Sequence, residues 1–144
     1  YEGADQRSVG WADVLVPTDS HPEGVKVRIV CTHLDAFGGN VTCLEQAKEV
    51  LEYAIQPAVD EGIPVLLAGD MNCGVSSSAI AEYVKSGDRL CNNDGTYERS
   101  SKLDYLIGFP KQKWTCTDYQ VIRTTEADAL SDHSPITGTA VLKN

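Results

Sequence analysis

The chain has 144 residues and a mass of 15.6 kDa, and 42% of the residues are hydrophobic, which suffices for one compact core but not for two ordinary domains. Its formal net charge of −9 argues against a protein that binds nucleic acid through a broad basic face. An acidic enzyme that meets a phosphate substrate through a metal ion is still allowed, because the cation supplies the missing positive charge. No run of about 18 apolar residues occurs, so a membrane-spanning helix is excluded.

The cysteine content and one glycosylation triplet, Asn40-Val41-Thr42, favour an extracellular setting. The five cysteines are Cys31, Cys43, Cys73, Cys91 and Cys116. None has a spacing suited to zinc, so we expect disulfides rather than metal thiolates, with one thiol left over. The chain starts without an initiator Met or a signal segment, which suggests a processed product, a trimmed chain or part of a longer protein. We predict a secreted protein.

The first half of the chain predicts a hairpin, a helix and a buried strand. Residues 7–16 and 25–32 are short apolar runs joined by a segment rich in turn formers, a pattern typical of a β-hairpin. Thr42 and Glu45 form a capping box, and apolar residues follow at helical spacing as far as Ala58, which predicts an amphipathic helix of about 16 residues. Residues 63–68 are uniformly apolar, as in a strand buried on both faces.

The second half predicts one further helix and three strands. The serines at 76–78 can cap a helix that runs to about Lys85, and Gly87 is placed to end it. Residues 88–101 lack periodicity and predict an irregular loop. Strands are expected near 103–108, 113–123 and 135–142, with an acidic loop through Glu126 and Asp128 before the last. The succession of elements indicates an α/β fold with a mixed sheet and helices against one face.

Four short motifs set polar residues beside the ends of apolar runs. In chain order they are Thr32-His33-Leu34-Asp35, Gly69-Asp70-Met71-Asn72, Leu103-Asp104-Tyr105-Leu106 and Ser131-Asp132-His133-Ser134-Pro135. Each motif alone is common by chance. Their two histidines, one asparagine and three of their aspartates (Asp70, Asp104 and Asp132) stand at consecutive strand ends, which nevertheless suggests one convergent polar pocket.

The residue types in these motifs suit hydrolysis of a phosphate ester. Asp70 and Asn72 stand two apart where a buried strand ends, so both side chains can point into one cleft. A carboxylate there can orient and deprotonate a water, and a carboxamide can hold that water or a phosphate oxygen. A protonated His133 can stabilise charge on phosphoryl oxygens if another group holds its ring. Taken alone, a Gly-Asp-x-Asn motif more often caps a turn and an Asp-His pair more often lies solvated in a loop, and it is the presence of all four motifs that favours a site.

On these motifs the chain resembles the endonuclease/exonuclease/phosphatase superfamily, which includes pancreatic deoxyribonuclease, abasic-site endonucleases, bacterial sphingomyelinases and inositol polyphosphate phosphatases. The match runs from Arg7 to Leu142 and covers a little over half of such a domain. The resemblance implies part of a four-layered α/β sandwich, in which mixed β-sheets pack face to face and helices lie outside. It makes residues 1–144 the C-terminal portion of a single domain whose N-terminal portion is missing.

The resemblance also implies a role for each motif residue. The catalytic set is His33, Asp70, Asn72, Asp104 and His133. In this reading Asp70 is the general base and Asn72 its positioning partner, while Asp104 orients His133 against the scissile phosphate. His33 and Asn72 bind the substrate phosphate. For each residue taken singly, a turn cap or a solvated loop position stays open as the alternative.

Two further residues complete the implied site. Arg7 faces the substrate phosphate, and Asp132 helps to bind the metal, which is Mg²⁺ or Mn²⁺. The glutamate and asparagine that chiefly bind the cation in the family lie upstream of anything present here. Asp132 with Asp70 or Asn72 offers too few ligands for the near-octahedral shell of magnesium.

The leading hypothesis is a divalent-metal-dependent phosphoesterase of nuclease, sphingomyelinase or phosphatase type, acting on nucleic acid, a phospholipid head group or another phosphate ester. The alternative is a catalytically inactive binding or assembly module on the same scaffold. In both cases a bare sheet would expose an apolar face. We expect the missing N-terminal half or another chain to cover it.

Overall fold

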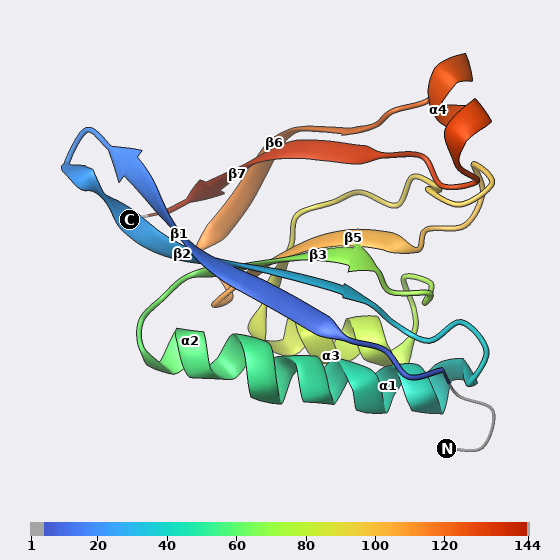
Figure 1. Ribbon diagram of the computed structural model, residues 1–144, viewed down its shortest axis with the longest axis horizontal. Coiled ribbons are helices and arrows are strands. Elements are labelled where there is room, and N and C mark those ends of the chain that lie inside the picture. The colour runs from blue at the N-terminus through green and yellow to red at the C-terminus, as the bar shows by residue number, and fades with distance from the viewer. Residues whose placement is uncertain (1–4, 144) are drawn as a thin grey trace.

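The computed structural model describes residues 5–143, which form a five-stranded mixed sheet, a two-stranded sheet and a layer of helices (Figure 1). The five-stranded sheet has the order β1-β2-β3-β5-β4. Its strands are β1 (Val9–Thr18), β2 (His21–His33), β3 (Val65–Asp70), β4 (Asp88–Arg89) and β5 (Asp104–Phe109). Only β2 and β3 run parallel; the other neighbours are antiparallel. The second sheet pairs β6 (Trp114–Val121) with β7 (Ile136–Leu142). The predicted α/β class with a mixed sheet is confirmed.

Helices cover one face of the large sheet, and the main core lies between the helices and that face (Figure 1). The helical segments there are α1 (Gly39–Val50), the π-helical turn η1 (Leu51–Ile55), α2 (Gln56–Asp60) and α3 (Ser78–Ser86). Val30, Leu67 and Ile107 point from the sheet into this core and are fully buried. Within residues 5–143, no helix has the length and apolar character needed to cross a membrane.

The first helix starts earlier than the capping box predicted. It begins at Gly39 with Gly38 at the N-cap, and Thr42 lies inside the helix, where its hydroxyl donates to the Gly38 carbonyl (3.0 Å). The buried Asp35 explains the shift, since its carboxylate accepts the N–H groups of Phe37 and Gly38 just before the helix. The capping-box pattern predicted Thr42 as the N-cap, but the Asp35 carboxylate, which lies outside that pattern, accepts the amides at the start of the helix instead.

The same helical segment widens before it ends. The N–H of Gln56 donates to the carbonyl of Leu51, five residues back, and Pro57 follows at the first turn of α2. Proline has no N–H to continue an α-helical ladder, so a π-turn at this point absorbs the break without ending the segment. In α3, by contrast, the predicted cap is confirmed, because Ser77 accepts the N–H of Ile80 (3.3 Å).

Two segments expected to be loops contain regular structure. The short strand β4 lies in the predicted loop 88–101, and α4 (Thr125–Leu130) replaces the predicted acidic loop. Thr124 caps α4 by accepting the N–H of Ala127 (3.1 Å), and Glu126 and Asp128 lie in the first turn, where negative charge suits the helix dipole. The acidic composition therefore indicated a helix start rather than a loop.

The disulfide prediction is not confirmed, because all five cysteines are free thiols in this structure. Cys31 is exposed on β2 and Cys116 is half-buried on β6, whereas the other three are buried. The buried Cys43 donates its S–H to the carbonyl of Asp35 (3.1 Å). Cysteine number carries no information on whether two Cβ atoms face one another at bonding distance.

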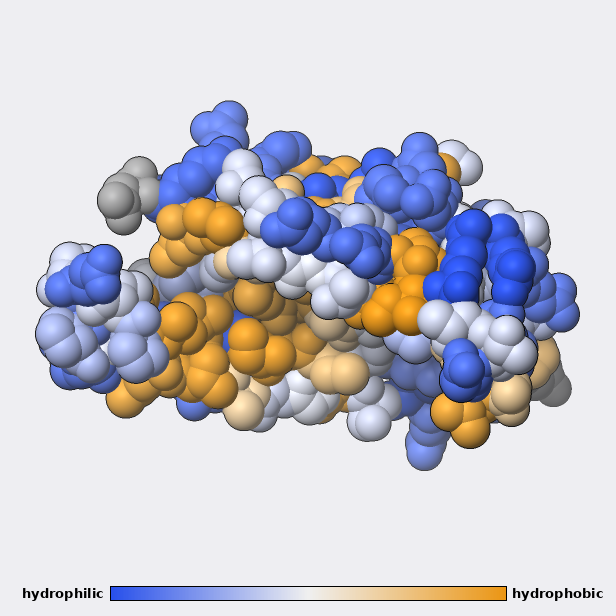
Figure 2. Space-filling view, turned by 90° about the horizontal axis from the view of Figure 1, so that it is seen from above, coloured by the Kyte–Doolittle hydropathy of each residue, from blue (hydrophilic) through white to orange (hydrophobic). Residues whose placement is uncertain are grey.

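The face of the sheet opposite the helices is apolar and only partly covered. Side chains alternate along β2 and β3, so Val27 and Leu66 point away from the helices and pack with Trp114 of β6. A groove of about 870 Å³ runs between the β1–β2 hairpin, β3 and the second sheet. Apolar residues gather on this side of the molecule (Figure 2), and Val16 and Ile29 along the groove are 45% and 38% exposed.

Candidate active site

Three of the motif residues form a row across three strands. The β2–β3 ladder pairs His33 with Asp70, and the β3–β5 ladder pairs Asp70 with Asp104. Residues opposite one another in a ladder share a face, so all three side chains leave the sheet on the same side, at the same edge. This is the side opposite the helices. Leu66 of β3 lies on the same face as Asp70, Leu106 of β5 lies on the same face as Asp104, and both leucines pack with Trp114 away from the helices.

The backbone before Asp70 is arranged for close approach. Gly69 has φ +154°, and a Cβ there would overlap the carbonyl oxygen of Thr32 on the neighbouring strand. Only glycine allows the two backbones to come so close at this point. The pairing that places His33 beside Asp70 therefore depends on the glycine of the Gly-Asp-Met-Asn motif.

His133 completes the group from a distant part of the chain. It precedes β7, and its Nδ1 lies 2.8 Å from Oδ2 of Asp104, which can accept a hydrogen bond from it. Its Nε2 lies 3.6 Å from Oδ2 of Asp70, and Nε2 of His33 lies 3.4 Å from the same oxygen. One carboxylate oxygen of Asp70 thus faces two imidazole rings.

The surroundings shift the pKa values of Asp70 and His133 in the same direction. Burial raises the pKa of Asp70 above its usual value, and the charge of Asp104 adds to this, although the N–H of Asn72 and the imidazoles oppose it. Burial lowers the pKa of His133, but the hydrogen bond to Asp104 and the charges of Asp104, Asp70 and Asp132 outweigh that effect, so its pKa is raised. These shifts favour a carboxylate that is a stronger base and an imidazole that holds its proton.

Asn72 lies in the turn after β3 and connects two loops. It has φ +47°, in the left-handed region that asparagine tolerates better than most residues. Its backbone N–H donates to Oδ1 of Asp70 (2.8 Å), and its side-chain amide donates to the carbonyl of Leu34 (2.9 Å). Asn72 therefore orients the Asp70 carboxylate and joins the β3 loop to the segment that follows His33.

Three of these residues together offer ligand atoms for a metal ion. Asp70, Asp104 and His133 each offer one ligand atom, and these atoms lie within 4.8 Å of one another. Carboxylate oxygens suit Mg²⁺ and Mn²⁺, and an imidazole is compatible with the softer of the two. Asp132, the metal ligand expected from the sequence, is exposed and is not one of the three residues.

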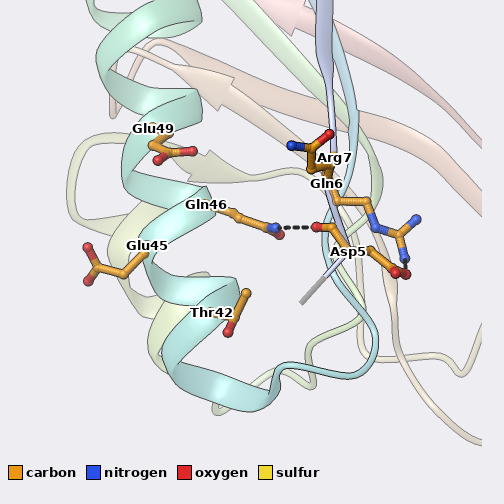
Figure 3. Close-up of a pocket in the computed structure, with 7 residues that line it drawn as sticks. All are labelled: Asp5, Gln6, Arg7, Thr42, Glu45, Gln46 and Glu49. Atoms are coloured by element: carbon orange, nitrogen blue, oxygen red, sulfur yellow. Dashed lines mark hydrogen bonds and ion pairs between the residues drawn. The ribbon is translucent and has the colours of Figure 1, made fainter. Parts of the chain in front are cut away.

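Arg7 lines a hollow beside α1, and its guanidinium points away from that helix (Figure 3). Its guanidinium is ion-paired with Asp5 (3.0 Å), and the hollow of about 530 Å³ is bounded on the other side by Thr42, Gln46 and Glu49 of α1. Among residues 5–143, Arg7 forms no hydrogen bond or ion pair with the residues of the strand-end group. The structure brings His33, Asp70, Asn72, Asp104 and His133 together, but not Arg7.

Sequence reasoning overlooked the loop that packs beside this group. Thr96 is fully buried and is hydrogen-bonded to segments on both sides of the Asp104–His133 pair, and the ring of Tyr97 lies 5.0 Å from the His133 ring. A Gly-Thr-Tyr triplet in a polar loop has no periodicity and no familiar spacing. A single sequence therefore contains no signal that distinguishes Thr96 from an ordinary turn residue.

Comparison with known proteins supports the fold. No family model and no curated protein matches the sequence. Among solved structures, a mannosyl-6-phosphatase of Bacteroides thetaiotaomicron matches with a TM-score of 0.72 and 18% identity, over 94% of this chain and 57% of that one. An endonuclease/exonuclease/phosphatase family protein of the same species matches with a TM-score of 0.71 and 20% identity, over 96% and 56%. The chain has the endonuclease/exonuclease/phosphatase fold.

A third solved structure that matches the chain contains bound metal ions. Beta toxin of Staphylococcus aureus, in a structure with bound magnesium ions, has a TM-score of 0.63 and 16% identity, over 95% of this chain and 58% of that one. The chain thus spans little more than half the length of the solved structures that it matches. The endonuclease/exonuclease/phosphatase resemblance inferred from the four motifs is confirmed as a likeness of fold.

Proposed function

We propose that this chain is part of a divalent-metal-dependent phosphoesterase in which water attacks a phosphate ester in line. The observation that carries the proposal is the convergence of Asp70, Asp104 and His133 within 4.8 Å, with His33 beside Asp70. This is the arrangement of base, orienting carboxylate and cationic acid that such chemistry requires. The fold shared with a phosphatase and with a magnesium-binding toxin supports it.

Asp70 is the general base in this proposal. Burial raises its pKa, and a carboxylate of higher pKa removes a proton from water more readily than an exposed one. The N–H of Asn72 holds Oδ1, which leaves Oδ2, the atom that faces both imidazoles, for the water. Asn72 therefore acts mainly by orienting the base, and its carboxamide is the proposed contact for a phosphate oxygen.

The two histidines stabilise the phosphate. Asp104 accepts a hydrogen bond from Nδ1 of His133, so that Nε2 carries its proton toward the space in front of Asp70. A protonated imidazole in this position opposes the negative charge that develops on phosphoryl oxygens. His33 faces the same space from β2 and is the second proposed donor. Arg7 remains a predicted substrate contact, although its ion pair with Asp5 would have to open.

The donor groups fit a divalent cation in part. Asp70 and Asp104 repel one another across the site, which is one cause of the raised pKa of Asp70, and a cation would relieve that repulsion. Asp70 and Asp104 are the residues that would hold it, with Asp132 as the further ligand proposed from the sequence. Magnesium takes about six oxygen ligands, so water, substrate or chain outside this sequence must supply the rest. When bound, the ion would act as a Lewis acid on the phosphoryl group.

We further propose that additional chain covers the groove on the sheet face. The groove is lined by Val27, Leu66 and Trp114 and lies on the same face of the sheet as the row of site residues, so a segment packed there would cover apolar side chains on that face. The matched structures are longer than this chain, and their additional length is the proposed source of cover. The secreted location remains a prediction.

The test is hydrolysis of bis(p-nitrophenyl) phosphate and p-nitrophenyl phosphate by the purified native protein and by the 144-residue chain, with Mg²⁺, Mn²⁺ or EDTA. We expect turnover that EDTA abolishes and added metal restores. Asp70→Ala and His133→Ala should abolish it, whereas His21→Ala, in the exposed hairpin turn, should leave it unchanged. Folded native protein without turnover on either ester would refute the enzyme and favour the inactive binding module.

A further inference from the structure

Thr96 connects the two segments that carry Asp104 and His133. Its hydroxyl oxygen accepts the N–H groups of Leu103 and Asp104, each at 3.1 Å, and its carbonyl oxygen accepts the N–H of Ser134 at 2.7 Å. Asp104 begins β5, and Ser134 directly follows His133. One residue, fully buried, is therefore bonded to the backbone on both sides of the 2.8 Å contact between Asp104 and His133.

The residues next to Thr96 strengthen the same connection. Tyr97 forms a backbone bridge with His133, and its ring lies against the imidazole at 5.0 Å with an interplanar angle of 51°. On the other side, the carbonyl of Leu103 accepts the N–H of Met71 at 2.8 Å, immediately after Asp70. The loop around Thr96 thus contacts the β5 start and the His133 segment directly, and the β3 end through one further bond.

We propose that Thr96 is a positioning residue that sets the distance and orientation between the Asp104 carboxylate and the His133 imidazole. The proposal deepens the function proposed above, because it assigns a cause to the geometry of that site and rests on the site being catalytic. Thr96 is not placed in contact with substrate. It acts through the backbone of Asp104 and Ser134.

The two amides that the hydroxyl accepts explain why a threonine suits this position. A hydroxyl oxygen has two acceptor lone pairs, and here both are used by N–H groups at the entry to β5. Buried N–H groups without a partner are costly, so removal of the hydroxyl would force the entry to β5 to move. Asp104 would move with its own amide. A displacement of about 1 Å between catalytic groups can cost on the order of 100-fold in rate.

The decisive comparison is between Thr96→Val and Thr96→Ser in the native protein. Valine keeps the shape but removes the acceptor, whereas serine keeps the acceptor and removes only a methyl group. The first readout is the NMR resonance of the His133 Nδ1 proton, assigned by its loss in His133→Ala. We expect Thr96→Ser to retain this resonance and Thr96→Val to lose it or shift it upfield. The carbon-bound ring protons of His21, in the exposed hairpin turn, are the internal reference, and their resonances should not change.

The second readout separates positioning from simple folding. In Thr96→Val we expect kcat to fall about 10- to 100-fold while KM changes by about 2-fold or less, and Thr96→Ser should restore kcat to nearly the original value. An unchanged Nδ1 resonance in folded Thr96→Val, or a loss of that resonance in Thr96→Ser equal to the loss in Thr96→Val, would overturn the proposal.

A measurement on the unmodified protein keeps the proposal testable if Thr96→Val does not fold. Amide hydrogen exchange should show protection at both Leu103 and Asp104. Free exchange at either amide would refute the pair of hydrogen bonds to the Thr96 hydroxyl. The outcomes also separate the two proposals. If the protein does not hydrolyse the esters but Thr96→Val still loses the Nδ1 resonance, the positioning role is supported and the proposed enzyme activity is refuted. If the protein hydrolyses the esters and the resonance of Thr96→Val is unchanged, the enzyme activity is supported and the positioning role is refuted.

Discussion

Replacement of Asp104 by asparagine tests the pairing on which the proposed chemistry depends. Asparagine has the same size and can still accept a hydrogen bond from His133, but it removes the negative charge beside the imidazole. The two side chains are 18% and 27% exposed and lie 2.8 Å apart, so solvent screens the interaction only in part. A hydrogen bond to a charged group contributes about 1.5–3 kcal/mol, which corresponds to a fall of about 10- to 150-fold in kcat/KM.

The same substitution should change the pH dependence of hydrolysis. Asp104 is the main cause of the raised pKa of His133, against the lowering effect of burial, and the charges of Asp70 and Asp132 add to it. If catalysis needs the imidazolium, activity is present below this pKa and is lost as pH rises through it. Asp104→Asn should therefore move the basic limb of the profile to lower pH. The acidic limb follows Asp70, whose pKa is raised by burial, and hydrolysis is lost as pH falls through that value.

The assay is kcat/KM on bis(p-nitrophenyl) phosphate as a function of pH, at saturating Mg²⁺. The matched control is Asp19→Asn, because Asp19 lies in the exposed hairpin turn between β1 and β2. Circular dichroism shows whether each variant is folded. A folded Asp104→Asn protein with the original kcat/KM and the original basic limb would refute the view that Asp104 holds His133 in its charged form.

Three other substitutions have definite expected outcomes. Asp70→Asn should abolish hydrolysis and leave the melting temperature unchanged or higher, because burial already disfavours the charged carboxylate; a clear fall in melting temperature with retained turnover would contradict its role as base. Tyr105→Phe should destabilise the fold by about 1–3 kcal/mol in urea titrations, because the fully buried hydroxyl donates to a backbone carbonyl at 2.9 Å, whereas Tyr53→Phe, 61% exposed, should have little effect. Leu67→Ala should cost about 2–5 kcal/mol by the same titration, because Leu67 is fully buried, and Leu130→Ala, 87% exposed, is its control.

Local patterns in the sequence predicted much of the fold. The uniformly apolar run before Asp70 is the central strand β3, Ser77 caps α3, and the turn-rich segment after Val16 forms the hairpin. These features follow from contacts between residues close in sequence, or from burial on both faces of a strand, and each leaves a readable pattern. Errors occurred where a more distant group took over, as at Thr42, where Asp35 bonds the amides before the helix.

Part of the candidate site was also predictable. The four motifs identified His33, Asp70, Asn72, Asp104 and His133, and the structure brings these residues together. Their roles in catalysis remain predictions. Arg7 was named on a short match; it is ion-paired with Asp5, and its contact with substrate stays a prediction. The cysteine count suggested disulfides that are not formed.

The sequence by itself determined which polar residues end the apolar runs, because the local pattern of apolar and polar side chains predicts the length and the ends of a strand. Only the tertiary structure decided that His33, Asp70 and Asp104 share one row, since that depends on the register of three strands distant in the chain. It likewise placed Thr96 between Asp104 and His133. The strand register depends on backbone N–H and C=O groups that nearly every residue possesses, and the partners of the Thr96 hydroxyl are likewise backbone amides, so neither set of partners can be identified from the amino-acid sequence.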